Sequence, residues 1–114
     1  MTDDIAFDKN VLRRLVDELG ATDAAEVLRA FLEDTRRKFE VLAAEVPDPS
    51  LVRQEAHSIK SSAGTFGFTG MSGLAQALEQ SALSMPPDQL KSATVALRRS
   101  FEMTTDFARS VLLP

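Results

Sequence analysis

The sequence predicts an all-α protein, an antiparallel up-down-up-down four-helix bundle with a short additional N-terminal helix. Three observations lead to this prediction. Apolar residues recur at intervals of three and four along nearly the whole chain, which is the spacing of one helix face. Short breaks that contain Gly or Pro separate these runs, and short connections favour antiparallel neighbours. No run of alternating apolar and polar residues indicates a strand.

The first predicted helix is short. Asp8 is its predicted N-cap, with Phe7 and Leu12 spaced for a hydrophobic staple. Gly20 predicts its end.

The second predicted helix follows at once. Thr22 or Asp23 is its predicted N-cap, and Glu26 completes a capping box with Asp23. Its predicted apolar face consists of Ala24, Leu28, Phe31, Thr35, Leu42 and Val46, with Phe39 at the edge. The "PDP" at 47–49 ends it.

Three more helices are predicted after this break. Asp48 caps the third, with Pro49 at the first helical position. Gly67 and Gly70 bracket the turn to the fourth, and "SMPPD" at 84–88 separates the fourth from the fifth. The predicted faces are Val52, Ala56, Ile59, Ala63 and Phe66 for the third; Met71, Leu74, Leu78 and Ala82 for the fourth; Leu90, Thr94, Leu97, Phe101, Thr104, Ala108 and Leu112 for the fifth.

Length and composition limit the class of protein. At 114 residues and 12.4 kDa, the chain has the length of one domain, which we predict over residues 1–114. The absence of cysteine excludes disulfides and thiolate metal sites. Neither a signal peptide nor the roughly 20 apolar residues of a membrane span is present, so we expect a cytoplasmic protein. The chain starts with Met and ends soon after the fifth helix. We expect a stand-alone protein, although an excised domain would look the same.

The single histidine of the chain, His57, lies in the third predicted helix. On a helical wheel, it is about 140° from the apolar face, with Lys60 about 80° and Gly64 about 120° from that face. His57 is therefore predicted to face outward, on a strip whose next members, Ser61 and Gly64, are small. Gly64 costs a helix about 1 kcal/mol relative to Ala, and access for another protein to His57 is the best reason for it.

Glu79 is predicted to face His57. The turn between the third and fourth helices is centred near Phe68, with His57 eleven residues before it and Glu79 eleven after it. In an antiparallel pair the two side chains lie at nearly the same height. Glu79 would then fix the tautomer of His57 and leave the other ring nitrogen free, with Lys60 near enough to meet an incoming anion.

Other chemistries fit the sequence poorly. A bundle metal site needs several inward carboxylates and histidines, whereas this chain has one histidine, which faces outward. A hydrolase triad needs a nucleophile on a strained elbow and an oxyanion hole, which a mid-helix histidine does not supply. The basic runs "RRK" at 36–38 and "RR" at 98–99 are most simply solvated helix faces. Net charge −4 and the absence of Trp and Tyr argue against a nucleic-acid partner.

The stretch "AHSIKSSAGTFGFTGMSGLAQALE", from Ala56 to Glu79, resembles the signature of histidine-containing phosphotransfer (HPt) domains. That signature runs His-x-x-Lys-Gly, a small pair, a later Gly, then Leu-x-x-Leu and a closing Glu or Gln. The family's fold is an α-helical bundle. Two departures stand out: Ser61 replaces the usual Gly, and Phe68 replaces a small residue.

The resemblance implies a phosphorelay function. His57 would accept the phosphoryl group through Nε2, Lys60 would stabilise it, and Glu79 would hold Nδ1. The partners would be the receiver domain of a response regulator and a histidine kinase. Partner-binding residues would be the small Ser61, Gly64 and Gly67, together with Phe68. Phe68 and residues of the first helix would form an exposed apolar docking patch near His57.

The sequence predicts a phosphoryl carrier rather than an enzyme, because "SSAGTFG" lacks the order of a nucleotide-binding loop. We expect no cofactor of its own, with Mg²⁺ on the receiver domain, and a monomer, because each long helix has one apolar face. Two alternatives stay open. One is a non-catalytic helical module that binds a kinase or response regulator. The other is the phosphoacceptor domain of a chemotaxis-type kinase, detached from its catalytic part.

Overall fold

The computed structural model describes residues 6–113, and within them the chain is all-helical, without a strand. Its helices are α1 (Lys9–Leu19), α2 (Ala21–Leu42), α3 (Pro49–Thr65), α4 (Thr69–Ser81) and α5 (Pro87–Phe107). A 3₁₀ turn, η1 (Ala82–Ser84), follows α4, and a π-helical turn, η2 (Ala108–Leu112), follows α5. No helix of this part of the chain is both long and apolar enough to cross a membrane.

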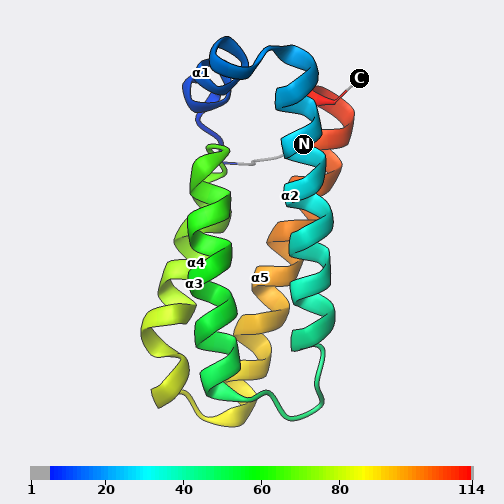
Figure 1. Ribbon diagram of the computed structural model, residues 1–114. Coiled ribbons are helices and arrows are strands. Elements are labelled where there is room, and N and C mark those ends of the chain that lie inside the picture. The colour runs from blue at the N-terminus through cyan, green and yellow to red at the C-terminus, as the bar shows by residue number, and fades with distance from the viewer. Residues whose placement is uncertain (1–5, 114) are drawn as a thin grey trace.

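The four long helices, α2 to α5, run side by side along the length of the molecule, while α1 lies across one end (Figure 1). The molecule is elongated, with extents of 44 × 29 × 21 Å. Helices α3 and α4 form the most extensive helix pair. A three-residue link joins them, so they run in opposite directions, and this pair positions the site.

Two of the predicted caps are confirmed. The carboxylate of Asp8 accepts a hydrogen bond from the backbone N–H of Asn10 at 3.0 Å, and that of Asp48 accepts one from Ser50 at 3.0 Å. The predicted cap of the second helix is wrong. Helix α2 begins at Ala21, directly after Gly20, and has no side-chain cap. Gly20, at φ 86°, turns the chain so sharply that Asp23 already lies in the first turn of α2.

Helices α2 to α5 contribute the core, as predicted, with three corrections. The buried apolar residues include Leu28, Phe31, Leu32, Val52, Ala56, Ile59, Ala63, Met71, Ala75, Leu78, Leu90, Leu97 and Phe101. Val46 is 76% exposed, because α2 ends at Leu42 and its periodicity stops there. Leu74 is 46% exposed, and Ala75 takes its place because it shares a face with Met71 and Leu78. Phe39 is buried rather than at the edge, and it stacks on Phe101.

Residues 6–8, the N-terminal segment before α1, cover the turn between α3 and α4. Phe68 is 1% exposed and packs against Phe7 and Phe31, with ring centroids 5.4 and 5.8 Å away. Gly67 has φ +83°, and its carbonyl accepts a hydrogen bond from the Asp8 N–H at 2.8 Å. A Cβ at Gly67 would lie 2.6 Å from the Asp8 carbonyl oxygen. This turn therefore belongs to the packed end of the molecule.

Candidate functional site

His57 and Glu79 face each other across the α3–α4 pair. The ring Nδ1 of His57 lies 2.7 Å from Oε2 of Glu79, a bond between residues 22 apart in sequence. The imidazole is 62% exposed, whereas Glu79 is only 20% exposed. A carboxylate can only accept a hydrogen bond, so Nδ1 carries the proton and its N–H donates the hydrogen bond to Glu79. In the neutral ring, Nε2 then keeps its lone pair for another group.

Lys60 also contacts Glu79. Its Nζ lies 2.8 Å from Oε1, the carboxylate oxygen that His57 does not use. Oε1 is buried and has no well-aligned hydrogen bond, so the contact is an ion pair by distance. The sequence placed Lys60 near an incoming anion. In the structure its ammonium is already engaged by a carboxylate of the same site.

The two contacts change the acidity of Glu79. The Lys60 ammonium first, and the hydrogen bond from His57 second, hold the pKa of the Glu79 carboxyl below its usual value, against a smaller opposing effect of desolvation. Glu79 is therefore an anion at neutral pH. An anion next to a neutral imidazole stabilises any positive charge that the ring acquires.

The small residues next to His57 lie where the wheel predicted. Ser61 and Gly64 are exposed on α3. A Cβ at Gly64 would meet only Ser72 Oγ, at 3.6 Å, which is an ordinary contact. Nothing inside the bundle therefore requires a glycine at this position.

Two predicted partner-binding residues are not on the surface. Gly67 and Phe68 are both buried under the N-terminal segment, for the packing reasons given above. The prediction of an exposed patch at Phe68 is wrong, because the periodicity of α3 and α4 gave no information on where residues 6–8 cross the turn. Phe68 stands where the signature described above has a small residue, and its large side chain fills space in the core.

Sequence reasoning missed Ser72. Its hydroxyl donates a hydrogen bond to the Lys60 carbonyl oxygen at 3.0 Å, across from α4 to α3. The signal was present in the spacing: Ser72 precedes Glu79 by seven residues, two helical turns, and so lies on the same flank of α4.

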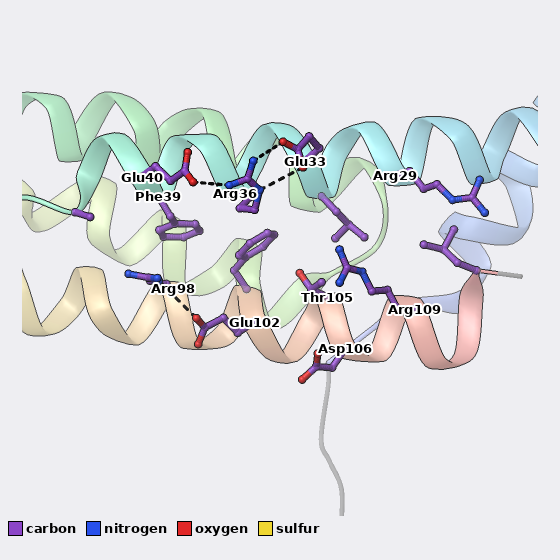
Figure 2. A pocket seen from close by; sticks show the side chains of 14 residues that line it. Arg29, Glu33, Arg36, Phe39, Glu40, Arg98, Glu102, Thr105, Asp106 and Arg109 are labelled. Atoms are coloured by element: carbon purple, nitrogen blue, oxygen red, sulfur yellow. Dashed lines mark hydrogen bonds and ion pairs between the residues drawn. The ribbon is translucent and has the colours of Figure 1, made fainter.

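A groove lies between α2 and α5, away from this site (Figure 2). It has a volume of about 760 Å³ and an apolar floor that includes the stacked Phe39 and Phe101. Its charged rim is largely self-paired, since Arg36 contacts both Glu33 and Glu40, and Arg98 contacts Glu102. His57, Lys60 and Glu79 do not line it. The predicted solvated character of the basic runs agrees with these exposed ion pairs.

Comparisons with known proteins identify the family and the fold. The family model of the Hpt domain matches residues 26–106, which include His57, Lys60 and Glu79. The crystal structure of histidine-containing phosphotransfer protein B (HptB) from Pseudomonas aeruginosa PAO1 superposes with a TM-score of 0.83, over 95% of each chain and at 21% identity, which is a likeness of fold. No curated protein matched the sequence. Because the family model covers more than half of the chain, the protein belongs to the Hpt domain family.

Proposed function

We propose that this protein carries a phosphoryl group on Nε2 of His57 in a phosphorelay, between a histidine kinase or receiver domain and an aspartate of a response regulator. The observation that carries the proposal is the pairing of an exposed imidazole with a carboxylate at its Nδ1, at 2.7 Å. The family match supports the same function.

The transfer needs little from this chain besides a positioned nucleophile. The Nε2 lone pair attacks the phosphorus of an aspartyl phosphate on the partner, the N–P bond forms, and the P–O bond to the aspartate breaks. The aspartate leaves as a carboxylate with the electron pair. The reverse step returns the phosphoryl group to an aspartate, and positioning and charge stabilisation carry most of the catalysis.

Glu79 has a defined role in this step. A phosphoryl group on Nε2 and a proton on Nδ1 give the ring a positive charge, which the Glu79 anion stabilises through the bond it already makes. Lys60 is tied to the other oxygen of the same carboxylate. Its ammonium has three N–H donors, so it can pair with this carboxylate and still offer a donor to a phosphoryl group.

The proposal has four further features. The functional unit is an antiparallel up-down-up-down bundle of α2–α5, with α1 as the additional N-terminal helix. It acts as a cytoplasmic monomer and a carrier, with no nucleotide site or cofactor of its own. The partners are protein domains rather than nucleic acid or membrane. A receiver domain supplies the Mg²⁺, and it approaches over Ser61 and Gly64.

The alternative is a helical module that binds a kinase or response regulator without accepting phosphate. The two functions share a docking surface and differ only at His57. The free Nε2 favours the carrier, because a binding module has no need of a carboxylate that orients its imidazole.

The test is transfer from phosphorylated receiver domains, with Mg²⁺, to wild type and to His57→Gln. Lys91→Gln, an exposed change on α5, is the matched control. Acid-labile, base-stable phosphate on wild type and on the control, with none on His57→Gln, supports the carrier. Binding of receivers without labelling of the folded wild type, from any receiver or kinase, supports the binding module.

A further inference from the structure

Ser72 makes an unusual hydrogen bond for a helical serine. Several other hydroxyls of this chain bond back to the carbonyl four residues earlier in their own helix, as Thr65, Ser81 and Thr94 do. Ser72 instead reaches from α4 to the backbone of α3, to the Lys60 carbonyl at 3.0 Å. Among residues 6–113, this bond and the His57–Glu79 bond are the two side-chain hydrogen bonds that join α3 to α4.

Apolar packing and a directional hydrogen bond both limit the sliding of α4 along α3. The seam between the two helices contains fully buried alanines, Ala56, Ala63 and Ala75. Small side chains offer shallow ridges, and apolar contact is non-directional. A hydrogen bond is directional and is lost by about 3.6 Å, so the partly buried Ser72 bond constrains the register at this point.

Two residues of α4 contact Lys60, one at its backbone and the other at the end of its side chain. Ser72 bonds its backbone carbonyl, while Glu79 pairs with its ammonium at 2.8 Å. Ser72 and Glu79 lie two turns apart on one flank of α4, so a shift at Ser72 moves Glu79 by the same amount. Glu79 would then leave the 2.7 Å distance at which it holds Nδ1 of His57.

We propose that Ser72 is a positioning residue for the phosphoryl transfer: its bond to Lys60 sets the register of α4 so that Glu79 meets His57. The inference rests on the proposed function, but its structural half concerns the His57–Glu79 bond and does not require a partner.

Three variants test the proposal. Ser72→Ala removes the inter-helix bond, and Ser72→Thr keeps a hydroxyl. Ser81→Ala is the matched control, because its hydroxyl bonds the Ala77 carbonyl within α4, at 2.7 Å. The readouts are the NMR signal of the His57 Nδ1–H proton and the transfer rate from a phosphorylated receiver, at saturating and at low receiver concentration.

We expect Ser72→Ala to weaken the protection of the Nδ1–H signal and to slow transfer about 3- to 10-fold at saturation, the effect of one hydrogen bond. The half-saturating receiver concentration should stay unchanged. Ser72→Thr should keep the signal and most of the rate, and Ser81→Ala should match wild type in both.

Three results would each overturn the role of Ser72. Ser72→Ala could keep the wild-type signal and rate, or Ser81→Ala could lose as much signal and rate as Ser72→Ala. A folded Ser72→Thr could also fail to recover the signal and rate. If no variant, wild type included, accepts phosphate, the proposed function fails. The Nδ1–H signal then still decides whether Ser72 positions Glu79.

Discussion

Replacing Gly64 with alanine tests separately whether the fold and whether a docking partner requires glycine at this position. Gly64 is the second-last residue of α3 and has helical backbone geometry. The added Cβ would meet only Ser72 Oγ, at 3.6 Å, so it neither clashes nor strains the chain. Alanine in a helix interior is more favourable than glycine by about 0.5–1 kcal/mol. Since Gly64 lies near the helix end, we expect a gain of about 0.5 kcal/mol, or about 2–4 °C in Tm.

Urea unfolding followed by circular dichroism measures this gain. The matched control is Gly73→Ala on α4, because Gly73 is also exposed and has nothing within 4 Å of its would-be Cβ. Gly73 is six residues before Glu79 and so points about 120° away from it around the helix. Both variants should be more stable than wild type.

Transfer from a phosphorylated receiver then distinguishes the two glycines. If Gly64 is small so that a receiver can approach His57, Gly64→Ala should raise the half-saturating receiver concentration several-fold and leave the maximal rate alone. Gly73→Ala should transfer as wild type does. A Gly64→Ala protein that is less stable than wild type would refute the packing argument, and one that is more stable and transfers normally would refute the access argument.

Three further predictions concern residues around the site. Gly67→Ala should lower the free energy of unfolding, measured in urea, by at least about 1–2 kcal/mol, because φ is +83° and the Cβ would lie 2.6 Å from the Asp8 carbonyl oxygen. An unchanged free energy of unfolding would contradict the described conformation of this turn. Phe68→Ala should lower the free energy of unfolding by about 3–5 kcal/mol, measured by thermal unfolding, and leave the transfer rate per folded molecule unchanged. A variant with normal stability that no longer docks a receiver would instead indicate that Phe68 is a surface residue. Because the folded-state pKa of Glu79 is lowered, its stabilising effect is present above the ordinary carboxyl pKa and disappears as pH falls through the lowered value. Acid titrations should therefore destabilise wild type more than Glu79→Gln, and equal losses would argue against the pairing.

The site was predictable where regular helix geometry decides the outcome. The outward direction of His57 and its height opposite Glu79 follow from 3.6 residues per turn and an antiparallel pair. The Nδ1–Oε2 distance of 2.7 Å agrees with that prediction. The caps at Asp8 and Asp48 were equally local and were also found.

Helix periodicity left out contacts with distant segments, the ends of long side chains and the exact helix ends. The burial of Phe68 depends on Phe7, which crosses the turn from the other end of the sequence. The ion pair between Lys60 and Glu79 was not predicted, because helix geometry does not fix the position of the end of a long, flexible side chain. The end of α2 at Leu42, before the "PDP" break, left Val46 outside the helix that its spacing suggested.

In the proposed mechanism, Glu79 holds Nδ1 of His57 and leaves Nε2 to take the phosphoryl group. The most direct measurement is NMR of the phosphorylated, ¹⁵N-labelled protein, in which coupling to ³¹P identifies the substituted ring nitrogen. We predict phosphorus on Nε2 and a proton on Nδ1 in wild type, with slower phosphorylation but the same site in Glu79→Gln. Phosphorus on Nδ1, or on a residue other than His57, would contradict the account.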